Sequence, residues 1–177
     1  MASQGTRAIE LLRREGVAHT VHAYELAARS GRERAERPNY GVEAAEALGV
    51  EPARVFKTLV ASVDGQLVLA IVPVTTELDL KRLGSAVGGR SASLADPTEA
   101  ERATGYVIGG ISPLAGRRRL PVVLDASATG HALILVSAGR RGLQVERAPA
   151  DLARLLNARS APLARTIGQV DVVHRTQ

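Results

Sequence analysis

The chain has 177 residues, of which 45% are hydrophobic and 23% are charged, and these proportions are typical of a globular domain. It contains no cysteine, which excludes disulfides, thiolate metal sites and a cysteine nucleophile. The net charge of +5 favours an anionic partner, whereas only 2% of the residues are aromatic, which argues against modules that bind nucleic acid on rows of stacked rings.

Helical and strand-like patterns alternate along the chain. Helical patterns, several with capping residues, cover residues 6–15, 41–49, 79–88, 96–105 and 149–158. Strand-like patterns cover residues 17–25, 54–63, 66–74, 121–126, 131–137 and 142–148. Asp64-Gly65 between two of these strands is a strong signal for a two-residue hairpin turn. The segment 27–40 is charged and unpatterned, and we expect an exposed loop there.

The order of these elements predicts an α+β fold. Hairpins dominate the strand connections, so a mixed, largely antiparallel sheet with helices packed around it fits better than a doubly wound parallel sheet. We expect one domain over residues 1–162 and a loose tail over 163–177. The first 30 residues lack the apolar core of a secretory signal, and no stretch is apolar enough to span a membrane, so we expect a cytoplasmic protein.

The segment "GYVIGGISPLAGRRRLP", residues 105–121, holds the clearest candidate site. Gly109 and Gly110 let the backbone approach a ligand closely, and Pro113 stiffens the exit from the segment. Exposed N–H groups there could bind a carbonyl oxygen, an oxyanion or a phosphate. A tight turn between strands is the plain structural alternative, and no P-loop lysine follows.

Lys57 is unusual because the chain has 21 arginines but only two lysines. It lies within the apolar run "VFKTLVASV", where its ammonium could act as a compact charge for a carbonyl or phosphate, or could simply reach water from a strand. The four histidines do not have metal-ligand spacing, so we expect no metal. No serine lies in a recognisable nucleophile motif, and Ser112 and Ser137 are better interpreted as hydrogen-bond donors.

Positive charge is concentrated in the C-terminal half. Between Tyr106 and Arg147 only Asp125 and Glu146 oppose six arginines, which are Arg117, Arg118, Arg119, Arg140, Arg141 and Arg147. This distribution suits a polyanion such as a nucleic acid, and a solvated basic face is the alternative.

Together these motifs resemble the YbaK/EbsC family of free-standing aminoacyl-tRNA deacylases, which are related to the editing domain of bacterial prolyl-tRNA synthetases. "HAYE", "NYGVEAAEALGVEPARVFKTL", "ADPTEAERATGYVIGGISPL", "RRRLPVVLD" and "VSAGRRGLQVE" occur in the family's order and approximate spacing. The resemblance covers about residues 6–160 and is closest to the YbaK branch. It implies a barrel-like editing-domain fold and no cofactor.

The resemblance also implies roles for individual residues. Lys57 and Thr58 match the family lysine and the residue after it, and the lysine is expected to face the aminoacyl end of the tRNA. The family's glycine loop falls on Gly109, Gly110, Ile111, Ser112 and Pro113, and would hold the ester carbonyl and the ribose. The pocket aromatics fall on Tyr24 and Tyr40, and the loop serine on Ser137. We expect the tRNA phosphates to meet Arg117, Arg118, Arg119, Arg140 and Arg141.

The resemblance implies removal of cysteine from mischarged Cys-tRNA(Pro), with prolyl-tRNA synthetase as a further partner. In the YbaK branch the substrate's own thiol is thought to attack its carbonyl, which a cysteine-free protein can support. One departure is Gln144, where some relatives carry Asp, so no acidic role is expected there. Two alternatives stay open: a deacylase for Ala-, Ser- or Thr-charged tRNA, or a non-catalytic module that binds tRNA or synthetase.

Overall fold

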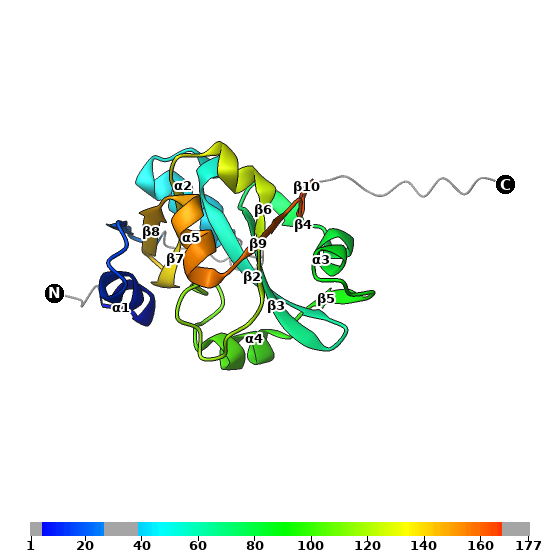
Figure 1. Cartoon of the computed structure of the whole chain (residues 1–177). Helices are drawn as coiled ribbons and strands as arrows, with labels where there is room; N and C mark the ends of the chain where they lie inside the picture. Colours follow the sequence, from blue (N-terminus) through cyan, green and yellow to red (C-terminus); the bar gives the residue numbers. More distant parts are fainter. Residues whose placement is uncertain (1–4, 27–38, 168–177) are drawn as a thin grey trace, which may run out of the picture.

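The computed structural model describes residues 5–26 and 39–167 (Figure 1). Most of the arginine-rich loop expected at 27–40 therefore lies outside the described residues, as does the end of the chain from residue 168. The helices in the described part are α1 (Arg7–Arg14), α2 (Tyr40–Leu48), α3 (Leu80–Ala86), α4 (Pro97–Thr104) and α5 (Pro149–Leu156), with short 3₁₀ helices η1 (Pro52–Arg54) and η2 (Ala126–Gly130). The strands are β1 (Thr20–Ala23), β2 (Phe56–Val63), β3 (Gln66–Pro73), β4 (Thr76–Leu78), β5 (Ala92–Leu94), β6 (Val122–Asp125), β7 (Ile134–Arg140), β8 (Leu143–Arg147), β9 (Arg159–Ala161) and β10 (Ala164–Thr166).

A five-stranded sheet in the order β5-β2-β3-β6-β9 forms the centre of the molecule. Its β2–β3 hairpin is the one that the sequence predicts. Asp64 and Gly65 both have positive φ angles, of 49° and 84°, as a two-residue turn that follows the strand twist requires. β3 pairs with β6, and β6 with β9, in parallel, whereas the other pairs of this sheet are antiparallel.

A second, antiparallel sheet has the order β1-β8-β7 and approaches the first at the start of β2. The two are joined by one parallel bridge, between Val55 and Leu135. A short antiparallel pair, β4 with β10, completes the arrangement. The predicted mixed, largely antiparallel fold with surrounding helices is confirmed.

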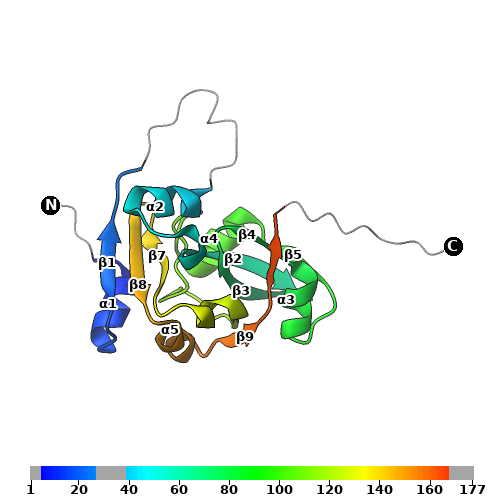
Figure 2. The same ribbon diagram turned by 90° about the horizontal axis from the view of Figure 1, so that it is seen from above.

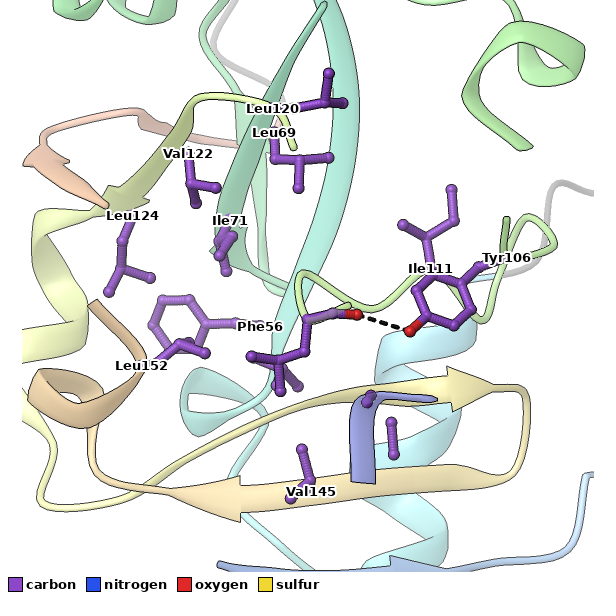
Figure 3. Packing of buried hydrophobic residues seen from close by; sticks show 14 of the residues in the cluster. Phe56, Leu69, Ile71, Tyr106, Ile111, Leu120, Val122, Leu124, Val145 and Leu152 are labelled. Carbon is purple, nitrogen blue, oxygen red and sulfur yellow. Dashed lines mark hydrogen bonds between the residues drawn. The ribbon is translucent and has the colours of Figure 1, made fainter. Parts of the chain in front are cut away.

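The alternation of side chains along β2 and β3 divides the interior into two main clusters. Phe56, Val60, Leu69 and Ile71 belong to the larger cluster, together with Ile111 from the glycine segment (Figure 3). Residues of the opposite face, including Ala61 and Val72, pack in a second cluster with Leu83 of α3. Lys57 and Thr58 therefore point to opposite faces of the same sheet.

Residues 163–167, which the sequence assigns to a loose tail, begin with a buried leucine and a paired strand. The reason is Asp125 at the end of β6. One of its carboxylate oxygens accepts hydrogen bonds from the N–H groups of Leu163 and Ala164, at 2.7 and 2.9 Å. Burial raises the pKa of Asp125, but these bonds and those from Ser127 outweigh burial, and the net pKa lies below the usual value.

Candidate active site

The glycine segment runs from Gly105, which caps α4 in a left-handed conformation, toward β6. Part of its backbone is satisfied internally. The N–H of Gly110 donates to the carbonyl of Val107 at 2.9 Å. The N–H of Leu114 donates to the hydroxyl oxygen of Ser112 at 3.2 Å. These bonds hold this part of the segment in a turn rather than in an extended conformation.

Several other N–H groups of the segment have no hydrogen-bond partner among the described residues, and those of Gly109, Ile111 and Ser112 lie together at the glycine pair. Ile111 and Ser112 are only 7% and 1% exposed, so water has little access to these donors. Because unpaired buried N–H groups are rare in proteins, such donors mark a site that a ligand acceptor completes.

Both glycines of the pair are needed for close contacts. Gly109 has a φ of 87°, and a Cβ there would lie 2.6 Å from the ring of Tyr40 and 2.7 Å from Nε of Arg141. A Cβ on Gly110 would lie 2.8 Å from the Cα of Arg140. The backbone of the glycine segment thus lies directly against α2 and the turn between β7 and β8.

That turn also brings in Tyr24 and Ser137. The register of the β7–β8 pair shifts between Ser137 and Arg140, and the N–H of Gly139 donates to the hydroxyl oxygen of Ser137 at 3.2 Å. The N–H of Tyr24 donates to the carbonyl of Gly142 at 3.0 Å. In these contacts the hydroxyls of Ser112 and Ser137 are acceptors, whereas the sequence suggested donors.

Two arginines, each lying over a tyrosine ring, donate to carbonyls at the start of the glycine segment. The guanidinium carbon of Arg141 lies 4.4 Å from the ring centre of Tyr40, and its Nε and Nη2 donate to the carbonyl of Ile108 at 3.0 and 2.6 Å. The guanidinium carbon of Arg7 lies 4.8 Å from the ring centre of Tyr106, and its Nη2 donates to the carbonyl of Thr104 at 3.0 Å.

Lys57 is half-buried on β2, and its ammonium donates to the carbonyl of Thr76 at 2.7 Å. Burial lowers the pKa of Lys57, and the negative charge of Glu77 offsets part of that decrease. β2 and β7 run parallel from the bridge between Val55 and Leu135. Lys57 lies two residues after Val55, and Ser137 lies two residues after Leu135. Because side chains alternate along a strand, Lys57 and Ser137 point to the same side as the two bridged residues. Lys57 and Ser137 thus lie on the same side of neighbouring strands. The amine of Lys57 donates to Thr76 rather than to the glycine segment.

Two buried polar side chains near these residues have an oxygen without a partner in the described residues. Thr58 faces the larger cluster, and its hydroxyl is unpaired. Gln144 lies opposite Ser137 in the β7–β8 pair, and its side-chain carbonyl oxygen is unpaired. The sequence marked Gln144 only as a departure from relatives, since burial of a glutamine has no sequence signal.

The five arginines that we expect to bind tRNA lie at different places around the glycine segment. Arg140 and Arg141 lie at the glycine pair. Arg118 and Arg119 line a cleft of about 360 Å³ together with Ser112 and Pro113 of the glycine segment and with Leu155 and Leu156 of α5. Ile134 and Leu135, which are neighbours on β7, belong to different clusters, the first with Leu152 of α5 and the second with Ala45 of α2. Figure 2 shows α5 and α2 near opposite ends of β8. Arg117 lies beside Gly105 and Arg7, and all three of Arg117, Arg118 and Arg119 are exposed.

In the described ranges no group of three or more His, Asp or Glu side chains is placed to hold a metal ion. His22 instead contacts Glu146 at 3.3 Å, and Glu146 also pairs with Arg54 at 2.5 Å. Within the same ranges, no helix has both the length and the hydropathy that crossing a bilayer requires.

The fold, together with relatives that are named as tRNA deacylases, identifies an aminoacyl-tRNA deacylase. The model of the aminoacyl-tRNA editing domain family matches residues 38–155, and the chain belongs to that family. The predicted resemblance is thereby confirmed.

Three comparisons illustrate the relationship. The chain is 40% identical over 121 residues to EbsC of Enterococcus faecalis, provisionally named a Cys-tRNA(Pro)/Cys-tRNA(Cys) deacylase; the match covers 67% of this chain and 73% of that protein. It is 42% identical over 73 residues to the multifunctional Ser/Thr-tRNA deacylase ProXp-y of Escherichia coli, covering 39% of this chain and 44% of that protein. A crystal structure provisionally described as a trans-editing enzyme for prolyl-tRNA synthetase has a TM-score of 0.77 at 26% identity, covering 92% of this chain and 99% of the other.

Proposed function

We propose that this deacylase removes cysteine from mischarged Cys-tRNA(Pro) as a free-standing editing enzyme, within a single domain that extends past the predicted boundary at residue 162 to include β10. The observation that carries the proposal is the set of unpaired N–H groups at Gly109, Ile111 and Ser112. Preorganised backbone donors of this kind stabilise the negative charge that develops on an ester carbonyl oxygen during attack. The provisional name of EbsC supports cysteine as the amino acid.

In this proposal the glycine segment holds the ester carbonyl and the terminal ribose. Lys57 supplies a positive charge at the aminoacyl end, with Ser137 on the same side of the strands. Tyr24, Tyr40, Thr58 and Pro113 line the space around the aminoacyl group. Since Thr58 faces the side of the sheet opposite to Lys57, it acts through its unpaired hydroxyl near the glycine segment rather than beside the lysine.

The substrate's own thiol is the nucleophile in the proposed reaction. Its sulfur attacks the ester carbonyl carbon, the bond from that carbon to the ribose oxygen breaks, and the thiol proton passes to the ribose oxygen. The products are tRNA with a free ribose hydroxyl and a cysteine thiolactone, which water then opens. The hydroxyls of Ser112 and Ser137 are bonded to backbone N–H groups rather than to a base, which supports a mechanism without a protein nucleophile.

A specific observation favours a second candidate, removal of serine or threonine. The buried, unpaired side-chain oxygen of Gln144 lies opposite Ser137 and would accept a hydrogen bond from a substrate hydroxyl. A site that pairs with a hydroxyl discriminates strongly against a substrate that lacks it. The similarity to ProXp-y agrees with this candidate.

The deciding experiment is deacylation of Cys-, Ser-, Thr- and Ala-charged tRNA by wild-type protein and by Gln144→Leu, with trapping of the first product. The proposal expects rapid loss of cysteine, slow loss of serine, and a thiolactone before free cysteine. If serine is lost as fast as cysteine and Gln144→Leu abolishes only the serine reaction, the second candidate is correct. If every charged tRNA stays intact while tRNA still binds, both candidates fail.

The partners in this proposal are the aminoacylated 3′ end of tRNA and prolyl-tRNA synthetase, and the location is the cytoplasm. The relationship to a trans-editing enzyme for that synthetase supports the second partner. Addition of the synthetase to the deacylation assay tests it: the proposal expects a higher rate with mischarged tRNA(Pro), and an unchanged rate removes the synthetase from the proposal.

A further inference from the structure

The surface beside the unpaired N–H groups consists of Arg141, Tyr40, Val107 and Ile108, which we call the Arg141 platform. Arg141 is exposed and lies over the ring of Tyr40. Val107 and Ile108 are large apolar residues with exposed fractions of 54% and 37%. The Arg141 platform thus combines exposed aliphatic side chains with a guanidinium held in place beside the candidate site. Such a surface suits a ligand with a flat face.

Arg141 is poorly placed to act as a flexible phosphate contact. Its Nε and one Nη2 hydrogen already donate to the carbonyl of Ile108, and its guanidinium carbon lies over the ring of Tyr40, 4.4 Å from the ring centre. The Cβ that Gly109 lacks would lie 2.7 Å from Nε of Arg141, so the side chain also rests on the glycine segment. Arg141 as a whole is nevertheless exposed, so a ligand can reach its side chain.

We propose that the Arg141 platform stacks against the 3′-terminal nucleobase of the charged tRNA. This inference rests on the proposed function, because it assigns the base next to the ribose that the glycine segment would hold. Guanidinium planes and aromatic rings are the groups on which proteins stack unpaired bases, and the apolar side chains of Val107 and Ile108 suit the edge of a base better than a phosphate. Arg140, which lies against Gly110 in the same turn, is left to the phosphates.

The binding test uses full-length protein and two single-stranded RNA oligonucleotides that differ only in whether the 3′-terminal nucleotide carries its base. Dissociation constants are measured at several salt concentrations. We expect wild-type protein to bind the oligonucleotide with the terminal base about tenfold more tightly, since stacking on one base is worth a factor of this order or more. Equal affinity for the two oligonucleotides would overturn the proposal.

The variants Arg141→Lys and Tyr40→Leu separate stacking from charge. Arg141→Lys keeps the positive charge but loses the plane, so the preference for the terminal base should disappear while the salt dependence stays the same. For a phosphate contact the opposite holds: Arg141→Lys would retain the preference, and Arg141→Gln would reduce the salt slope by about 0.7. Tyr40→Leu should also lose the preference, and it provides a second variant if the first is poorly folded.

Arg7→Lys is the matched control, because Arg7 lies over Tyr106 in the same way but donates to the carbonyl of Thr104, just before the glycine segment, and not to Ile108. It should keep the preference for the terminal base. Loss of the preference in Arg7→Lys as well as in Arg141→Lys would mean that the variants act by disturbing the segment, and the stacking assignment would then be wrong. Deacylation is measured separately: if wild-type protein prefers the terminal base but deacylates no charged tRNA, the proposed function fails while the stacking result stands.

Discussion

Two arginine–tyrosine pairs among the described residues have the same chemistry and different surroundings. Arg7 lies over Tyr106, a tyrosine only 6% exposed whose hydroxyl donates to the carbonyl of Leu114 at 2.6 Å (Figure 3). Arg141 lies over Tyr40 among exposed apolar residues. Both arginines also donate to a carbonyl at the start of the glycine segment. Burial of the ring therefore decides whether such a pair anchors the core or presents a surface.

Lys57 is another cation that donates to a backbone carbonyl, and its replacement should have the largest effect on activity. Lys57→Ala removes the half-buried charge that we place at the aminoacyl end, so deacylation should fall about 100-fold or more. The control is Lys81→Ala, which removes the other, exposed lysine and should leave the rate unchanged. Single-turnover deacylation measures both. A folded Lys57→Ala protein with the wild-type rate would remove Lys57 from the mechanism.

Gly109→Ala and Gly105→Ala break the two pairs separately. A Cβ at Gly109 would lie 2.6 Å from the ring of Tyr40, and one at Gly105 would lie 2.5 Å from Nη2 of Arg7. Both glycines have positive φ, so the intrinsic backbone cost is similar. We expect both variants to lose the stability that a side chain at positive φ costs. Gly109→Ala should in addition lower deacylation at least tenfold, whereas Gly105→Ala should lower the melting temperature further and leave the rate of the folded protein near that of wild type. Equal losses of stability would show that the two pairs do not differ in role.

The sequence predicts the fold more completely than the arrangement of the site. Asp64-Gly65 is a local signal with one common outcome, and the hairpin is where it was expected. The contact of Gly109 with Tyr40 joins segments far apart in the chain, and no spacing rule specifies it. The pairing of β10 likewise depends on Asp125, whose carboxylate binds N–H groups nearly 40 residues away.

Glu77 tests whether the charge of Lys57 is what matters. The Glu77 carboxylate raises the pKa of Lys57, against the larger lowering by burial, so Glu77→Gln should lower that pKa further. If deacylation needs the protonated lysine, activity is lost as pH rises through its pKa, and the alkaline limb of kcat/KM should move to lower pH in the variant. Glu99→Gln, an exposed substitution on α4, should leave the limb in place. If the alkaline limb of kcat/KM is unchanged in Glu77→Gln, the group whose titration produces that limb is not Lys57.

Arg147 provides the smallest predicted effect and the sharpest contrast with both pairs. It is 1% exposed, and no nitrogen of its guanidinium has a hydrogen-bond partner within the described residues. Burial lowers its pKa, Asp151 offsets part of that effect, and Arg154 adds to it. A buried cation without hydrogen bonds costs free energy that neither Arg7 nor Arg141 incurs.

Arg147→Met keeps most of the buried stem, so the free energy of unfolding should rise by about 1 kcal/mol. Chemical denaturation measures the change, and a clear loss of stability would mean that the guanidinium is satisfied within the core, as those of Arg7 and Arg141 are at the glycine segment.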